Sequence, residues 1–254
     1  MKMFGLKRNT VWITAVLCVI LMAGCGNAGK EKKEETKADP AKQEETYKKL
    51  QESAVSESED PMTNQVDFEE LKKSNPDIYA WIYIPGTNIN YPILQSETED
   101  DEYYLNTTMD KKEGLPGSVY TEKYNRKDFE DPVTVIYGHT LKAGTMFSQL
   151  ANYTDRAFFD QNPYVYIYQQ GQTLKYQIFS AVAFDDRYLL GNYNFDIAED
   201  FEEYIEELNS SLDGNVNPQA AVNPQSKVIT LSTCIDEFPE QRWLVNAVLL
   251  EKQQ

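Results

Sequence analysis

Short apolar runs bounded by turn residues recur along most of the chain from residue 79 onward. Val228-Ile-Thr-Leu231, between Lys227 and Ser232, is an example. β-Branched and aromatic residues dominate these runs, which is typical of β-strands. We expect eight strands, in residues 79–84, 89–94, 117–121, 133–137, 164–168, 173–184, 228–231 and 243–250.

Helical patterns are fewer. In residues 197–212, Phe201, Ile205, Leu208 and Leu212 recur at helical spacing and acidic residues occupy the opposite face. Many short strands with few helices favour a closed or nearly closed β-barrel over a doubly wound sheet. Shorter helical segments are expected in residues 68–72, 100–105, 146–150 and 155–159.

The first 25 residues have the pattern of an export signal. Lys2, Lys7 and Arg8 precede an apolar run over residues 11–23. Leu21-Met-Ala-Gly-Cys25 resembles a bacterial lipobox, which predicts lipidation at Cys25 after cleavage. The alternative is an uncleaved signal anchor, although the run is shorter than the roughly 20 apolar residues that normally span a bilayer. Either way, we expect the protein at the extracytoplasmic face of the cell membrane, tethered by its N-terminus.

Residues 26–65 are mostly polar and charged, with few large apolar side chains. Such a segment cannot bury enough surface to offset its ordering entropy. We therefore expect a flexible stalk with a short exposed helix over residues 44–53, followed by a folded domain over residues 66–254.

Charge and cysteine content limit the range of functions that the protein could have. A net charge of −17 argues against nucleic acid as a partner, because phosphate contacts need clustered Lys and Arg. Cys18 and Cys25 belong to the N-terminal segment, which leaves Cys234 as the single thiol of the domain. A lone thiol is either inert and buried or reactive. Its place at a strand end favours the reactive interpretation.

Cys234, His139 and Arg242 each lie at the edge of a predicted strand, and His139 is the only histidine. A thiolate is a nucleophile, an imidazole can protonate a leaving amine, and a guanidinium can stabilise an oxyanion. Together they suit acyl transfer at an amide. The alternatives are a structural loop role for His139 and a surface ion pair of Arg242 with Asp236, Glu237 or Glu240. Asp236 is a candidate to orient His139 or Arg242, or is simply a solvated loop carboxylate.

The segment Thr230-Leu-Ser-Thr-Cys234 is similar to the TLxTC signature of sortases. Tyr137-Gly-His139 matches the histidine site of that family. Arg242 occupies the position, after the cysteine, of the catalytic arginine of the family. Residues 75–87 and the helix over residues 197–212 resemble class B sortases in particular. The resemblance covers roughly residues 66–250. It departs from class B at Thr140, where Asn is frequent, and in the lipobox-like N-terminus.

The resemblance implies an eight-stranded sortase-type β-barrel with short N-terminal helices and one helix between the sixth and seventh strands. It also implies a transpeptidase in which Cys234 attacks a threonyl carbonyl in a C-terminal sorting motif. An amine of a peptidoglycan precursor would then resolve the thioacyl enzyme and anchor the surface protein to the cell wall. His139 would transfer protons and Arg242 would hold the oxyanion, without a metal or cofactor. Candidate substrate contacts, each with packing as the alternative role, are Thr233, Leu231 and Tyr188.

Two rival functions follow from the same residues. A cysteine peptidase or L,D-transpeptidase-like hydrolase also combines Cys with His, but those enzymes carry a His close before the Cys and none lies near Cys234. The second rival is a non-enzymatic surface lipoprotein, for which Cys234 would be inert.

A structural zinc site is a poor alternative for Cys234 and His139, because one Cys and one His cannot form it without several recruited carboxylates.

Overall fold

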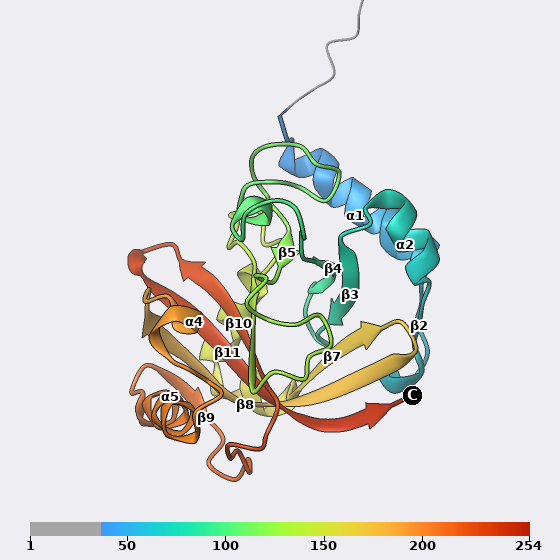
Figure 1. Ribbon diagram of the computed structural model, residues 1–254. Coiled ribbons are helices and arrows are strands. Elements are labelled where there is room, and N and C mark those ends of the chain that lie inside the picture. The colour runs from blue at the N-terminus through green and yellow to red at the C-terminus, as the bar shows by residue number, and fades with distance from the viewer. Residues whose placement is uncertain (1–36) are drawn as a thin grey trace, which may run out of the picture. The chain divides into compact units, whose positions relative to one another are not determined.

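The fold is a closed barrel of eight strands (Figure 1). The computed structural model describes residues 37–254. The sheet runs in the order β11-β10-β6-β5-β4-β3-β7-β8, and pairing of β8 with β11 closes the ring. All eight predicted strands are confirmed, as β3 Ile78–Tyr83, β4 Asn90–Leu94, β5 Val119–Tyr120, β6 Val133–Tyr137, β7 Tyr164–Gln169, β8 Gln172–Asp185, β10 Val228–Ile235 and β11 Phe238–Gln253.

Strand β10 lies between β6, with which it runs parallel, and β11, with which it runs antiparallel. Its first six residues are all buried. A strand covered on both faces needs no polar side, which explains why Val228, Ile229 and Leu231 do not alternate with charged residues. Strand β9 Gly214–Val216, one of three short strands that were not predicted, extends the sheet beside β8.

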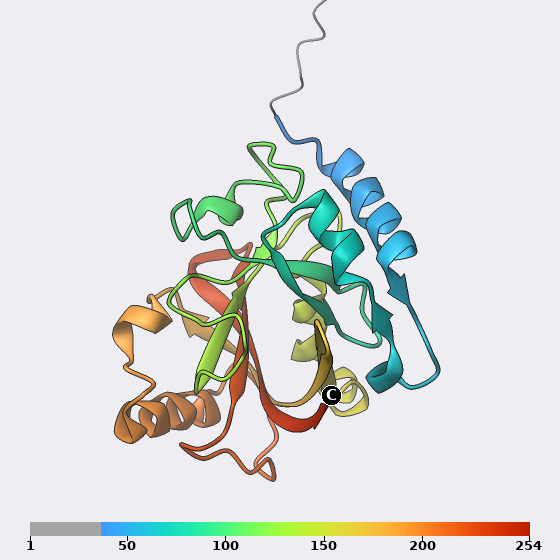
Figure 2. The ribbon, with the colours of Figure 1, turned by 45° about the vertical axis from the view of Figure 1, so that its right-hand side comes forward.

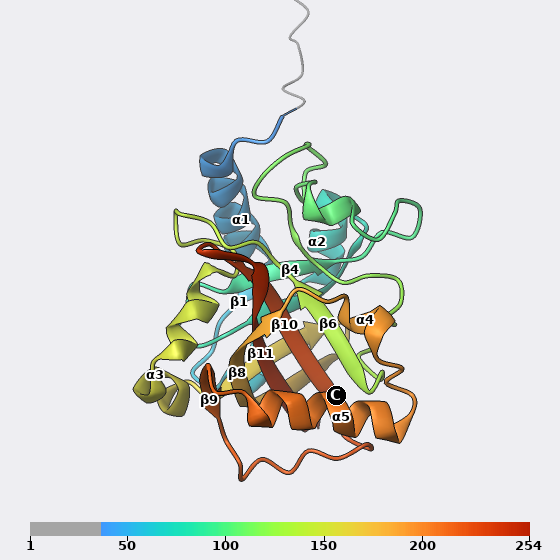
Figure 3. The ribbon, with the colours of Figure 1, turned by 90° about the vertical axis from the view of Figure 1, so that its left-hand side faces the viewer.

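A second apolar core lies outside the barrel, under α4 Leu189–Asn192 and α5 Ala198–Ser210. Figure 3 shows α5 lying across the flank of the barrel that carries β6, β10 and β11. Phe201, Ile205 and Leu208 are buried there, as the helical pattern predicted. The prediction for Leu212 was wrong: the chain leaves the helix at Ser211 and Leu212 is 98% exposed.

The N-terminal part of the described chain packs against the barrel instead of standing free as a stalk. Helix α1 Pro40–Ala54 buries Tyr47, Leu50 and Ala54, which are three and four residues apart and therefore share one helix face. It lies beside α2 Phe68–Ser74 (Figure 2). The packed domain thus begins by residue 40 and not at residue 66. The connection contains β1 Val55–Ser56, η1 Pro61–Thr63 and β2 Gln65–Val66.

The expected signal peptide, lipidation at Cys25 and the first part of the stalk lie outside the described residues. Within residues 37–254, every helix is too short or too polar to cross a bilayer. The short helical segments expected elsewhere are found as η2 Tyr103–Leu105, η3 Ser148–Thr154 and α3 Arg156–Gln161.

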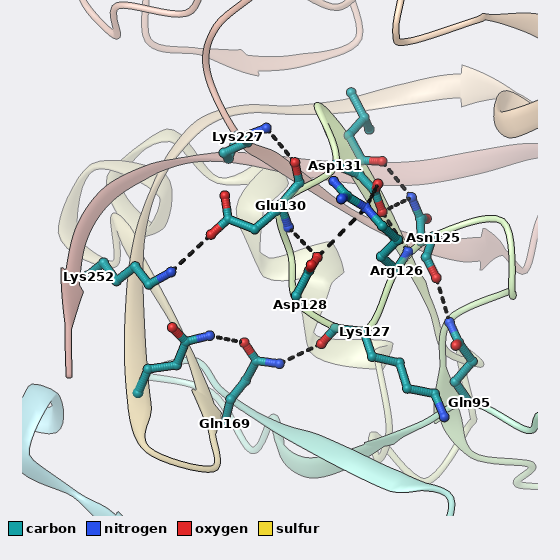
Figure 4. Close-up of polar contacts among 12 residues, drawn as sticks. Gln95, Asn125, Arg126, Lys127, Asp128, Glu130, Asp131, Gln169, Lys227 and Lys252 are labelled. Carbon is teal, nitrogen blue, oxygen red and sulfur yellow. Dashed lines mark hydrogen bonds and ion pairs between the residues drawn. The ribbon is translucent and has the colours of Figure 1, made fainter.

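The loop that joins β5 to β6 is held by a polar network (Figure 4). The Asn125 side chain donates to the Val133 carbonyl oxygen at 2.8 Å and accepts from the Val135 amide at 2.9 Å. Arg126 is paired with Asp131 at 2.8 Å. The side chain of Gln95 donates to the carbonyl oxygen of Asn125 at 2.8 Å. Strand β6 therefore starts from a fixed loop, and residues 138–139 follow directly from its other end.

Candidate active site

Cys234 and Arg242 face each other across the hairpin formed by β10 and β11. They are direct register partners, and Cys234 is exposed. Directly opposed residues of antiparallel strands have Cα atoms about 4.5–5.5 Å apart. The register then shifts, so that Ile235 lies opposite Phe238 and residues 239–241 bulge from β11. Bulges next to a site commonly re-aim a side chain.

The guanidinium of Arg242 bonds only within this bulge in the part of the chain described here. Its Nη1 donates to the carbonyl oxygens of Pro239 at 2.9 Å and Gln241 at 3.0 Å. Arg242 makes no ion pair within residues 37–254, so the predicted alternative of a surface pair with a neighbouring carboxylate is not found. Since a guanidinium has five N–H donors, most remain available to a bound substrate.

His139 follows the end of β6, the strand that pairs with β10. Tyr137 is the register partner of Ser232, and the Gly138 amide donates to the Ser232 carbonyl oxygen at 3.2 Å. His139 lies two residues beyond Tyr137 and lines the same cavity as Cys234, which lies two residues beyond Ser232. A side chain at residue 138 would force Phe147 to move, because an added Cβ would lie 2.7 Å from its ring.

Thr140 ties the histidine segment to the cysteine segment. Its hydroxyl donates to the Cys234 carbonyl oxygen at 2.9 Å and lies 2.9 Å from the hydroxyl of Thr233. Thr140 was noticed in the sequence only as a departure from class B, and no role was predicted for it. Its place directly after the histidine was the available signal.

The three predicted catalytic side chains line one cavity of about 350 Å³. Thr233 and Tyr188, two of the predicted substrate contacts, also line it. Leu231 does not: it is fully buried in the barrel core, which supports its alternative packing role. The remaining lining residues are Glu102, Leu105, Tyr120, Glu122, Tyr137, Gly138, Asp185, Asp186, Arg187, Leu189, Ser232 and Leu244.

Asp236 is exposed on the turn between β10 and β11 and does not line the cavity. The hydrogen bonds of the Arg242 side chain go to Pro239 and Gln241, and that of the His139 ring goes to Leu105. Asp236 therefore orients neither side chain in this structure, which leaves the solvated loop carboxylate as its interpretation.

Glu122 contributes a buried carboxyl to the cavity wall and was missed in the sequence. It is 6% exposed and accepts a hydrogen bond from the Tyr188 hydroxyl at 2.6 Å. Burial raises the pKa of Glu122, the Tyr188 hydrogen bond opposes that shift, and Asp101 and Glu102 add to it. Nothing in the local sequence distinguishes this residue from other loop carboxylates, because its burial and its bond to Tyr188 depend on the tertiary fold.

Within residues 37–254, no group of three or more His, Cys, Asp or Glu side chains is arranged to hold a metal ion. The arrangement does bring together an exposed thiol, an imidazole and a guanidinium with free donors. Such a set can perform nucleophilic acyl transfer, in which the thiol attacks, the imidazole moves protons and the guanidinium meets the oxyanion.

Comparisons with known proteins agree with this chemistry. The family model described as the sortase domain matches residues 82–250. Sortase B of Listeria monocytogenes is 31% identical over 189 residues, which cover 73% of this chain and 75% of the relative. Sortase B of Staphylococcus aureus is 28% identical over 235 residues, covering 92% and 93% of the two chains.

Solved structures show the same likeness. The crystal structure of Clostridium perfringens sortase B matches with a TM-score of 0.63 and 31% identity, over 72% of this chain and 99% of the other. A Staphylococcus aureus sortase B–substrate complex matches in fold with a TM-score of 0.66 at 24% identity, over 83% and 97% of the two chains. The chain thus belongs to the sortase family of cysteine transpeptidases, among the class B members.

Proposed function

We propose that this enzyme cleaves a C-terminal sorting motif after threonine and joins the new carboxyl end to an amine of a peptidoglycan precursor. The observation that carries the proposal is the direct pairing of Cys234 with Arg242 at a cavity that His139 also lines. A threonyl carbonyl bound over Cys234 would lie between a nucleophile and a guanidinium.

The reaction then has two balanced halves. His139 takes the thiol proton as the Cys234 sulfur attacks the threonyl carbonyl, and the guanidinium of Arg242 stabilises the oxyanion. When the peptide bond breaks, His139 gives a proton to the leaving amine and a thioester remains on Cys234. An incoming amine attacks the thioester and His139 takes a proton from it. The Cys234 sulfur leaves and regains that proton from His139, so that an amide and the free thiol are formed.

Incubation with a panel of fluorogenic pentapeptide sorting motifs, with and without glycine or diaminopimelate as the amine, tests this function. We expect cleavage of a subset of peptides and an amide-linked product by mass spectrometry. Cys234→Ala is the control and should give no cleavage, with the fold retained because the thiol is exposed. Cleavage in which water is the only acceptor would support a hydrolase instead, and cleavage by Cys234→Ala would remove Cys234 from the mechanism.

We further propose that the enzyme works at the extracytoplasmic face of the membrane, tethered through a lipid on Cys25, and acts on surface proteins that carry the motif. The support is the lipobox-like sequence that ends at Cys25. Metabolic labelling with a clickable fatty acid tests it: the wild type should be labelled and Cys25→Ala should not. Labelling that is equal in both proteins would contradict the lipid tether.

A further inference from the structure

The His139 ring is bonded to a backbone carbonyl, and this contact determines which ring nitrogen carries the proton. Nε2 of His139 lies 2.7 Å from the Leu105 carbonyl oxygen. A carbonyl oxygen has no proton to donate, so Nε2 must be the donor. In the neutral ring the free lone pair is then on Nδ1, and only Nδ1 is available to accept or release a proton.

The Leu105 carbonyl belongs to a segment in which four successive carbonyl groups are engaged. The Tyr104 oxygen accepts from the Ser118 amide at 2.9 Å and the Asn106 oxygen accepts from the Gly114 amide at 2.7 Å. The Thr107 oxygen accepts from the Ser118 hydroxyl at 2.9 Å. With Leu105 bonded to His139, residues 104–107 have no unpaired carbonyl. The acceptor of the histidine is therefore held in place by its neighbours along the chain.

Gly117 provides the space that this carbonyl occupies. Its φ is +62°, and a Cβ added to it would lie 2.3 Å from the Leu105 oxygen and 3.0 Å from the Tyr104 oxygen. A heavy atom at 2.3 Å would displace the oxygen that bonds His139. Glycine is thus needed at residue 117 both for its backbone conformation and for this close approach.

We propose that the Leu105 carbonyl and Gly117 are positioning elements that fix His139 as the Nε2–H tautomer, so that Nδ1 is the nitrogen that moves protons. The tautomer follows from the geometry alone, whereas its use in catalysis rests on the proposed transpeptidase function. A third group that orients the base is a recurring requirement of thiol and hydroxyl nucleophile sites. In this site a main-chain carbonyl performs that role.

Nitrogen-15 NMR of the imidazole tests the proposal directly, because His139 is the only histidine in the chain. In the full chain, at a pH at which the ring is neutral, we expect a single Nε2–H tautomer and a slowly exchanging Nε2 proton. A Nδ1–H tautomer, or a mixture of both tautomers, in the wild type would overturn the proposal.

Gly117→Ala should displace the Leu105 oxygen, abolish the Nε2 proton signal and produce a mixture of tautomers. Gly171→Ala is the matched control, because Gly171 also has a positive φ, +83°, yet nothing lies within 4 Å of an added Cβ. It imposes similar backbone strain in the β7–β8 turn and should leave the imidazole spectrum unchanged. An unchanged Nε2 proton signal in Gly117→Ala would contradict the role of Gly117.

A second variant covers the case in which Gly117→Ala does not fold. Replacing the amide between Leu105 and Asn106 by an ester weakens the Leu105 carbonyl as an acceptor without changing any side chain. The Nε2 proton should then exchange faster than in the wild type, and an unchanged exchange rate would overturn the proposal.

Kinetics separate this inference from the proposed function. Gly117→Ala should lower kcat for motif cleavage by at least about tenfold, part of the roughly 10²–10⁴ that a positioned acid–base group contributes, with KM little changed. An unchanged kcat would contradict the catalytic use of the tautomer. If no peptide is cleaved by the wild type while the Nε2–H tautomer is observed, the proposed function fails and the positioning of His139 stands.

Discussion

The two sides of the thiol are held in different ways. On one side, His139 is fixed by the Leu105 carbonyl through its ring, and its neighbour Thr140 is bonded to Thr233 and Cys234. On the other side, Arg242 stands opposite Cys234 but donates only to carbonyl oxygens of its own bulge. The imidazole is positioned before substrate arrives, whereas the guanidinium keeps donors free for it.

The difference matches what each group has to do in the proposed reaction. A proton-transfer group works through distance and tautomer, so fixing it in advance lowers the cost of the reaction step. A guanidinium that meets a developing oxyanion has to exchange its ground-state partners for the new charge. Weak local acceptors such as the Pro239 carbonyl allow that exchange more readily than a buried carboxylate would.

The largest effect is expected from the fixed side. His139→Ala removes the single imidazole and should lower kcat/KM for motif cleavage by about 10²–10⁴. The variant should still react with a thiol-specific probe at high pH, since Cys234 is exposed. Turnover near the wild-type value would assign His139 to structure and erase the contrast between the two sides.

Arg242→Ala should lower kcat/KM by about 10²–10³, or about 2.7–4 kcal/mol, the usual cost of a lost oxyanion donor. Arg242→Lys keeps the charge but loses the planar fork and should recover only part of the rate. Arg187→Ala is the matched control: Arg187 lines the same cavity, but its guanidinium is held by Asp185 and Glu207. An equal loss in the two alanine variants would show that Arg242 acts only through the charge of the cavity.

Thr140→Ala should have a smaller effect on both rate and stability. Loss of the Thr140 hydroxyl removes two hydrogen bonds and should lower the free energy of unfolding by about 1–3 kcal/mol. Thr140→Ser retains the hydroxyl and should restore both properties, as measured by denaturant titration and peptide cleavage. If the serine variant behaves like alanine, the methyl group and not the hydroxyl carries the effect.

Glu122→Gln should give the smallest change, visible in the pH dependence of stability. Burial raises the pKa of Glu122, so the folded state binds its proton more tightly than the unfolded state does. The wild type should lose stability as the pH rises above about 4.3, the ordinary glutamate value, until Glu122 ionises in the folded state. Denaturant titrations from pH 4 to 7 should show that Glu122→Gln lacks this decline.

Glu102→Gln is the control for that experiment, because Glu102 lines the same cavity but is exposed. It should retain most of the decline seen in the wild type, because burial and not Glu102 is the largest cause of the raised pKa of Glu122. If Glu122→Gln also retains it, then Glu122 is not the group responsible, and the pH dependence arises elsewhere in the domain.

Much of the barrel could be predicted because its signals are local. The strand β10 is buried on both faces, so its run of Val228, Ile229 and Leu231 is readable without knowing its neighbours. The helix α5 is equally plain, because Phe201, Ile205 and Leu208 lie on one face. The helix expected over residues 44–53 is found as α1, but the expectation that it is exposed was wrong. Among its many polar residues it has three buried apolar side chains, Tyr47, Leu50 and Ala54. So few apolar positions become informative only when the surface that they cover is known.

Of the site, too, the sequence predicted some residues and missed others. Cys234, His139 and Arg242 were predicted as site residues from residue type, strand ends and the TLSTC segment, and the fold brings all three to one cavity. Leu231 and Asp236 were placed among the site candidates because they are close in sequence to Cys234, and the fold puts both outside the cavity. Glu122 was not found, because its hydrogen-bond donor, Tyr188, lies 66 residues away in the chain.

The sequence by itself determined the strands, the candidate nucleophile and the family, because these depend on side-chain type and on spacing within a few residues. Only the tertiary structure decided how the imidazole is held. The Leu105 carbonyl reaches His139 across 34 residues of chain, and Thr140 reaches Cys234 across 94. A main-chain oxygen is the same in every residue, so its role as an acceptor is set by where the fold places it.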